Sequence, residues 1–478
     1  MLLTLAFRHL VVRPGRAVVL LLGYALGVGV MIVLLSVGEA MLDQSRDVSL
    51  VGGGEVTVLP EGIDIEAMRT GGLAGMFFSI DRARFLTRQL LGGPRWRGTV
   101  RAVSPVIEHK LLYLQAGGRL VAVRAGAEIP SRAAAMEVDL DLRSGQWRDS
   151  PADSAYVAPT PEQLYHELDR FHLNPTGDST WAEWQYFNLE TGPGEWWYLT
   201  FLLGGQVPAG QWGGQVLVSH HTSDGRVARY RAEVPPNRIA FDTTRADVTI
   251  GPGSVHQADG RYAIRISGLS GLSDLSVDLD ITPAPNRYFP AVLLREDALL
   301  SGYVVPALSA TATGRLCVAR RCQAVHDIPA YHDHNWGVWR DVSWDWGSGR
   351  GATFNLLYGG VHVADSAAAR GSLFVALVDS LGVRQVFRTP RILYSGSRAV
   401  PGEAGLRAPA AFEFVALREG DTIRVVTEID EVQATRRGTA AAATWFLQMR
   451  GRFRLQGRVA GAAAADSGAG FFETYVPG

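Results

Sequence analysis

The part of the sequence that most constrains the fold runs from Trp181 to the C-terminus. It consists of short runs in which apolar and polar residues alternate, separated by Gly, Pro, Asn or Asp turns. Alternation with a period of two puts apolar side chains on one face of a strand. Short strands at such spacing predict a mainly β fold, either a sandwich or a barrel. The clearest runs are Gln215–Ser219, Arg226–Val234, Tyr262–Ile266, Thr353–Tyr358, Leu373–Val378, Arg424–Ile429 and Met449–Gln456.

A segment rich in chemistry, YHDHNWG, occupies residues 331–337. Pro329 precedes it and Gly337 ends it, which predicts a short strand. Because successive strand residues point to opposite faces, the segment divides into two sets. One face carries Tyr331, Asp333 and Asn335, and the other carries His332, His334 and Trp336.

The face with a phenol, a carboxyl and an amide suggests acid catalysis. If it lines an apolar cavity, burial raises the pKa of Asp333 and allows it to hold a proton. A protonated carboxyl in an apolar pocket is a general acid. The alternative is a polar cluster that only ties a barrel together through hydrogen bonds. We predict Asp333, Tyr331 and Asn335 as catalytic residues.

The histidines of the other face have the spacing of a metal-binding pair, but no third ligand can be identified. The predicted helix Pro161–Phe171 offers His166, Glu167 and Asp169, and His172 follows it. We interpret these residues as a solvated helix face, since nothing fixes their convergence. We therefore predict no metal and no cofactor.

The 331–337 segment resembles the signature of the hydroxyneurosporene synthase family, the carotenoid 1,2-hydratases, within a lipocalin-like superfamily. Three further stretches add to the resemblance. Glu195-Trp196-Trp197-Tyr198 is similar to an early strand of that superfamily, and a sister copy begins at Glu183. Phe472-Glu473 resembles its last strand. Val304–Thr313 lacks the His and Trp that those hydratases carry there.

The resemblance implies two consecutive lipocalin-like β-barrel halves, at 181–305 and 306–478, around an apolar cavity. It also implies redox-neutral addition of water to an isoprenoid double bond, which makes the protein a hydratase-like lyase. A hydratase, isomerase or cyclase acting on a polyene fits this expectation. The alternative is a non-enzymatic carrier of an apolar ligand or lipid. We expect aromatic side chains to contact the ligand, namely Trp336, Trp339, Trp184, Trp197 and Tyr198.

The two cysteines, Cys317 and Cys322, flank a basic tip between two strand-like runs. They would face each other across a hairpin. A disulfide is expected in an oxidising compartment, and a pair of reduced thiols is the alternative. Farther along, Val459–Gly470 is rich in Ala and Gly and predicts a flexible or short-stranded insert.

The N-terminal segment predicts a membrane anchor. Ala17–Gly38 has no charged residue and is long enough to span a bilayer, with arginines before it and acids after it. This asymmetry predicts a cytoplasmic N-terminus in a bacterial inner membrane, with the main domains outside. A cleaved signal peptide is the alternative. The segment resembles the first helix of ABC permeases of the macrolide-exporter and lipoprotein-releasing type, which implies an ABC ATPase or permease as a partner.

The remaining organisation follows from local patterns. Residues 1–40 form the predicted anchor, 41–150 a small α+β module, and 151–180 a linker with a short helix. Within the module we expect a helix over Ile80–Leu91 and a hairpin across Gly117-Gly118. A net charge of −1 gives no electrostatic basis for binding nucleic acid. The expected partners are thus an apolar small molecule and the membrane.

Overall fold

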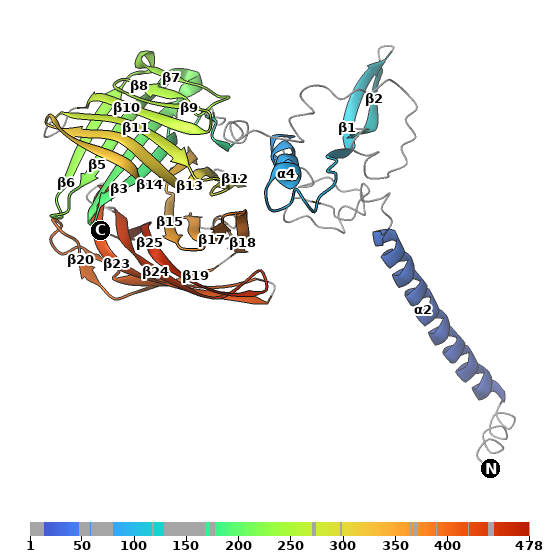
Figure 1. The fold of residues 1–478 in the computed structure, drawn as a ribbon. Coiled ribbons are helices and arrows are strands. Elements are labelled where there is room, and N and C mark those ends of the chain that lie inside the picture. Colours follow the sequence, from blue (N-terminus) through green and yellow to red (C-terminus); the bar gives the residue numbers. More distant parts are fainter. Residues whose placement is uncertain are drawn as a thin grey trace. The chain divides into compact units, whose positions relative to one another are not determined.

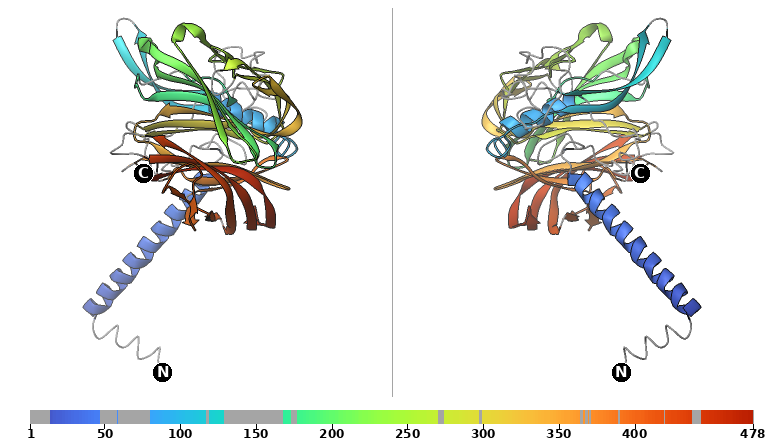
Figure 2. Two further views of the ribbon diagram at one scale, coloured as in Figure 1. Left: turned by 90° about the vertical axis from the view of Figure 1, so that its left-hand side faces the viewer. Right: turned by 90° about the vertical axis from the view of Figure 1, so that its right-hand side faces the viewer.

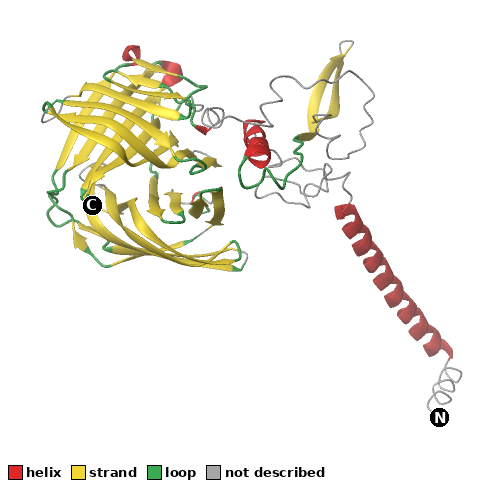
Figure 3. Ribbon diagram, in the orientation of Figure 1, coloured by secondary structure: helices red, strands yellow, loops and turns green. Residues whose placement is uncertain are grey.

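The computed structural model describes residues 14–46, 58, 80–116, 119–128, 168–172, 177–269, 274–296, 299–363, 366, 369, 371–388, 390–418, 420–437 and 444–477. The chain divides into two compact units. The first comprises Met1–Gly92 with Trp96–Ala158, and the second Gly93–Arg95 with Pro159–Gly478. Strands dominate the second unit (Figure 3).

The first unit contains helix α2 (Pro14–Arg46), helix α4 (Ile80–Gly92) and the antiparallel pair β1 (Val106–Ala116) and β2 (Arg119–Glu128). The predicted helix and hairpin of the α+β module correspond to α4 and β1–β2. The predicted membrane segment, Ala17–Gly38, lies within α2. Over the described residues, no helix is both long enough and apolar enough to cross a membrane.

The second unit is mainly β, as predicted, and begins with a strongly curved sheet of twelve strands (Figure 1). Their order is β6-β5-β4-β3-β14-β13-β11-β10-β9-β8-β7, and β12 pairs with β13. The strands are β3 (Trp181–Gly192), β4 (Glu195–Gln206), β5 (Gln211–His221), β6 (Val227–Val234), β7 (Ile239–Phe241), β8 (Val248–Ile250), β9 (Gly253–Ala258), β10 (Arg261–Leu269), β11 (Leu275–Pro283), β12 (Phe289–Glu296), β13 (Leu299–Val318) and β14 (Arg321–Val338).

A second sheet of nine strands follows in the order β18-β17-β16-β15-β25-β24-β23-β22-β19. Figure 2 shows both sheets from two further sides. The strands of the second sheet are β15 (Ser343–Gly351), β16 (Asn355–His362), β17 (Phe374–Asp379), β18 (Gly382–Arg388), β19 (Arg391–Ser395), β22 (Ala411–Arg418), β23 (Asp421–Arg437), β24 (Thr444–Val459) and β25 (Ala462–Pro477). Separately, β20 (Arg398–Ala399) pairs with β21 (Arg407–Ala408).

The border between the two sheets lies between Val338 and Ser343, so the predicted border at 305/306 is misplaced. That position falls inside β13, which forms a long hairpin with β14. Because β14 pairs on its other edge with β3, this hairpin completes the first sheet rather than opening the second. The predicted Ala/Gly-rich insert is also different, since its Ala462–Gly470 part belongs to β25.

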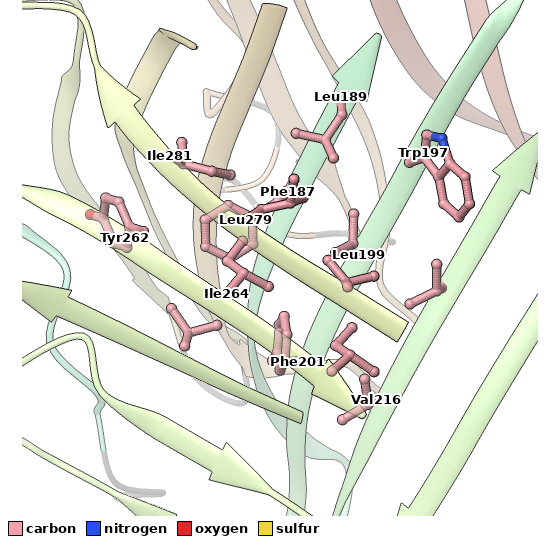
Figure 4. Packing of buried hydrophobic residues seen from close by; sticks show 14 of the residues in the cluster. Phe187, Leu189, Trp197, Leu199, Phe201, Val216, Tyr262, Ile264, Leu279 and Ile281 are labelled. Carbon is pink, nitrogen blue, oxygen red and sulfur yellow. The ribbon is translucent and has the colours of Figure 1, made fainter. Parts of the chain in front are cut away.

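The first sheet wraps around its own apolar core (Figure 4). Phe187 on β3 lies opposite Leu199 on β4, and Leu189 lies opposite Trp197. All four side chains are buried because residues two apart on a strand share a face. Fully burying one such side chain contributes about 1.5–3 kcal/mol. The apolar face that the sequence alternation creates therefore holds this sheet closed around its interior.

Two further clusters complete the packing. The second sheet has its own core, in which Tyr358, Phe412 and Phe453 are buried. A third cluster draws aromatic residues from both sheets, for example Tyr303 from β13 and Phe374 from β17. Their rings stack at 5.7 Å between centroids. The two sheets are thus joined by an aromatic layer.

The β13–β14 hairpin turns through Ala319 and Arg320, both with positive φ. Positive φ at both central residues is the geometry of a two-residue hairpin turn. Cys317 and Cys322 pair directly across the hairpin, and the structure links them by a disulfide bond. This is the arrangement that the sequence suggested.

Candidate active site

Strand β14 presents the 331–337 segment to two environments. Asp333 and Asn335 line a cavity of about 550 Å³ between the two sheets. His332 and His334 point to the interior of the first sheet, where both are fully buried. The predicted division of the segment into two faces therefore matches the structure. Each face has its own polar network.

The cavity is walled by aromatic and apolar side chains. Its volume falls within the range of about 300–1,000 Å³ that is usual for small-molecule sites. Residues from the first sheet and from the second both contribute. Polar side chains reach it as well, among them Asp333, Asn335, Gln448, Glu473, Arg229 and Arg231. A concave, mainly apolar space with polar groups placed in it is typical of a ligand site.

Three donors converge on the Asp333 carboxyl. Tyr331 donates its hydroxyl to Oδ2 at 2.8 Å, and Asn335 donates its amide to Oδ1 at 2.7 Å. Trp346, on β15 of the other sheet, donates its indole N–H to Oδ2 at 3.1 Å and lies 3.1 Å from the Tyr331 hydroxyl. The three residues predicted from one strand face therefore form one cluster, and Trp346 joins it from a strand that the sequence did not associate with them.

Burial decides the protonation of Asp333. It raises the pKa of this carboxyl from 3.8 to about 7, against the opposing effect of hydrogen bonds from Tyr331, Asn335 and Trp346. Burial, together with the adjacent charge of Asp333, also raises the pKa of Tyr331 well above 10. At neutral pH, Asp333 can therefore hold a proton while Tyr331 stays a neutral donor.

Three of the five predicted ligand-contacting aromatics lie in the cavity lining. Trp184 on β3 and Trp339 after β14 pack at 4.7 Å between ring centroids, and Tyr198 lies on β4. Trp344 joins the first two, 5.5 Å from Trp339. Burial raises the pKa of Tyr198 to about 12, so it remains a neutral phenol. Their role in ligand binding stays a prediction.

The other two predicted aromatics are not in the lining. Trp336 shares the face of His332 and His334, and it stacks on His172 at 3.7 Å. Trp197 is buried in the core of the first sheet and stacks on His220 at 3.6 Å. The reason is strand alternation, since Trp197 and Tyr198 are neighbours on β4 and cannot face the same side.

Glu473 is a second carboxyl in the cavity that the sequence did not predict as a site residue. It lies on β25, opposite Trp346 of β15. Trp344 donates its indole N–H to Glu473 Oε2 at 3.1 Å, and Gln448 donates to Oε1 at 3.1 Å. The signal for it in the sequence is Phe472-Glu473, which resembles the last strand of the hydroxyneurosporene synthase family.

The face of β14 behind the cavity carries a buried imidazole–carboxylate network. Asp169 lies 2.8 Å from His332 Nε2 through Oδ2 and 2.6 Å from His334 Nδ1 through Oδ1. Burial opposes ionisation of Asp169, but the charge of His332 and hydrogen bonds from both histidines hold its pKa below the ordinary value. Burial lowers the pKa of His334, yet the hydrogen bond to Asp169 and the nearby carboxylate of Glu183 outweigh it and raise that pKa to about 9.

His172 and Glu183 extend this network. The two Glu183 oxygens accept the backbone N–H of His172 at 2.7 and 3.0 Å, and His172 Nδ1 lies 3.0 Å from Oε1. Burial lowers the pKa of His172. The interpretation of Asp169 and His172 as parts of a solvated face was therefore wrong. His166 and Glu167 lie outside the described residues.

The chain matches no protein-family model and no curated protein. Similar solved structures include a protein assigned as AttH from Nitrosomonas europaea, at 17% identity and a TM-score of 0.42, covering 63% of this chain and 96% of that one. CghA matches at 12% identity and a TM-score of 0.45, covering 67% and 96%. Kievitone hydratase from Nectria haematococca matches at 13% and 0.41, covering 64% and 97%. At these values the likeness carries no argument about function.

Proposed function

We propose that this protein binds an isoprenoid or other polyene in the cavity between its sheets and protonates one of its double bonds. The reaction class is redox-neutral and covers hydration, isomerisation or cyclisation. The observation that carries the proposal is the position of Asp333. It combines burial, a pKa near neutrality and an opening onto an aromatic cavity.

Asp333 would act as the general acid. Its O–H bond breaks, a C–H bond forms at one alkene carbon, and the adjacent carbon becomes a cation. The carboxylate that remains is the species that the donors of Tyr331, Asn335 and Trp346 are placed to stabilise. Donors fixed in advance around a developing charge lower the barrier because they need not reorganise. The arrangement therefore favours the transition state over the resting acid.

The aromatic walls would stabilise the carbon cation. Ring faces carry partial negative charge and attract a cation within about 6 Å of the centroid. Trp184, Trp339 and Trp344 form such a group at one part of the lining.

Glu473 is the candidate base for the second half of the reaction. In hydration it would take a proton from the water whose oxygen bonds to the cation. In isomerisation it would take a proton from the neighbouring carbon. Either step restores the proton balance after one exchange with solvent. Its place in the same cavity, on a different strand from Asp333, supports an acid–base pair.

The test is deuterium transfer. The full-length protein is incubated in D₂O with an acyclic carotenoid in detergent micelles, and the recovered carotenoid is analysed by mass spectrometry. We expect carbon-bound deuterium with the wild type and its loss with Asp333→Asn. This readout responds to protonation whichever product forms.

Organic extraction of the purified protein identifies any ligand that the cavity retains. If an isoprenoid is recovered but the wild type transfers no deuterium to it in D₂O, the protein is a carrier of an apolar ligand. In that case the catalytic proposal fails.

A further inference from the structure

We propose that His172, Glu183 and His334 bind a divalent transition-metal ion, with Zn²⁺ as the reference ion. One ligand atom from each of these residues lies within 4.8 Å of the others. The site is on the face of β14 opposite Asp333 and does not depend on the catalytic proposal. Two imidazoles and a carboxylate are a ligand set that zinc and other first-row ions accept.

The distances fit a compact metal site. Glu183 Oε1 lies 3.0 Å from His172 Nδ1 and 2.8 Å from His334 Nε2. In a tetrahedral zinc site with bonds of about 2.0–2.1 Å, ligand atoms are separated by about 3.3 Å. The two contacts to Glu183 therefore need to open by only a few tenths of an ångström. Side-chain rotations of this size leave the strands in place.

His334 supplies the observation that points to a ligand. Its Nε2 is buried and lacks a hydrogen bond, because the contact to Glu183 Oε1 is close but out of line. A buried polar atom without an aligned partner is destabilising. A metal ion that displaces the Nε2 proton and binds this nitrogen would satisfy it.

Asp169 gives His334 the second contact that metal-binding histidines show. A ligating imidazole almost always donates its other N–H to a carboxylate, a backbone carbonyl or water, which fixes the ring and its tautomer. Here His334 Nδ1 lies 2.6 Å from Asp169 Oδ1. Asp169 is itself fixed by His332, whose other nitrogen lies 3.0 Å from the Tyr186 carbonyl oxygen. The ring is thereby held with Nε2 toward Glu183.

Charge balance favours a divalent ion. The Asp169 and Glu183 side chains are only 0% and 1% exposed. Buried carboxylates require a compensating charge. One divalent cation supplies two positive charges, in place of the single charge that a protonated His334 gives them. His172 is 23% exposed, so solvent reaches the cluster on that side and can provide a fourth ligand.

The test measures metal content. The full-length protein, prepared without a polyhistidine tag, is stripped with a chelator, equilibrated with Zn²⁺ alone and desalted. Elemental mass spectrometry then gives the metal per chain. We expect one zinc per wild-type chain. The zinc affinity of His172→Ala should fall by more than the roughly 10–100-fold that is typical of lost outer-shell partners. Co²⁺ in place of Zn²⁺ should give visible absorption bands of an N/O-coordinated ion in the wild type.

His220→Ala is the matched control. His220 contacts the Glu195 carboxylate at 2.9 Å and stacks on Trp197 at 3.6 Å, much as His172 contacts Glu183 and stacks on Trp336. His220 belongs to no metal-like cluster among the described residues. This variant should keep its zinc.

Glu183→Gln gives a second reading of the site. It should lose the zinc, and far-UV circular dichroism checks that it folds. If it does not fold, His172→Ala decides the question, because His172 is only partly buried. A wild type that retains no more zinc than His172→Ala overturns the proposal. Equal loss of zinc from His172→Ala and His220→Ala overturns it as well.

Discussion

Trp346 donates its indole N–H to the Asp333 carboxyl at 3.1 Å, although the two residues belong to different sheets. A donor that bonds the carboxylate stabilises its charged form. The second sheet therefore tunes the acidity of a group that the first sheet carries. This contact makes the cavity a joint product of both sheets, so neither sheet alone carries the complete site.

Trp346→Phe should raise the pKa of Asp333 and lower the maximal rate of proton transfer. Without the indole N–H, the pKa of Asp333 rises further, so the upper limb of the pH–rate profile moves to higher pH. The maximal rate falls by roughly 10- to 100-fold, since a hydrogen bond to a charged group is worth about 1.5–3 kcal/mol. The pH–rate profile of deuterium transfer measures both. Trp344→Phe removes the equivalent bond to Glu473 and should leave this pKa unmoved.

Asp333→Asn should abolish most of the proton transfer while the cavity keeps its ligand. The amide has the size of the carboxyl but cannot donate an acidic proton. We expect deuterium transfer to fall by roughly 10²–10⁴-fold, the usual contribution of a general acid. Ligand retention, measured by extraction, should persist. A variant that transfers deuterium at the wild-type rate would show that Asp333 is not the acid.

The stability of the wild type should depend on pH through Asp333. The folded protein holds this proton up to a pKa of about 7, whereas the unfolded chain releases it near 3.8. The stabilising contribution is therefore complete below about pH 3.8 and is lost as pH rises through about 7, with a slope of at most about 1.4 kcal/mol per pH unit. Asp333→Asn has no such slope. Urea unfolding of both proteins between about pH 4 and pH 8 measures the difference, and parallel curves would contradict the high pKa.

Gly359→Ala tests whether the position of Trp346 matters. A Cβ at Gly359 would lie 2.3 Å from Trp346 Cε3, so the indole must move. Overpacking of this kind costs about 1–3 kcal/mol of stability. We also expect slower deuterium transfer, although Asp333 itself is unchanged. Gly213→Ala, whose Cβ would approach only a backbone oxygen at 3.1 Å in the first sheet, is the control.

Much of the fold and part of the site could be predicted from the sequence. Period-two alternation gave the strands, and it gave the division of residues 331–337 into two faces, because both are local properties. The contact from Trp346 and the second carboxyl of Glu473 could not be predicted. They depend on which strands of two sheets face each other across the cavity, and no local pattern encodes this.

The buried imidazole–carboxylate network behind β14 could not be predicted for the same reason. Asp169 and His172 lie far from His334 in the sequence, and only the path of the chain before β3 brings them together. Their spacing alone suited a solvated helix face equally well. The misplaced border at 305/306 arose because the long β13–β14 hairpin was divided between two expected halves, whereas its pairing with β3 and β11 keeps it in one sheet.

The cross-strand disulfide has a consequence for the fidelity of folding. Strand β14 carries a carboxyl on one face and imidazoles on the other. A shift of one residue in its pairing register would exchange the two faces. In the native alignment Cys317 lies directly opposite Cys322. A slipped hairpin would move the two thiols out of opposition, so the bond forms readily only when the turn end of the hairpin has its native alignment. The disulfide therefore forms in molecules whose hairpin is correctly aligned at the turn, and free thiols identify the molecules whose hairpin is not.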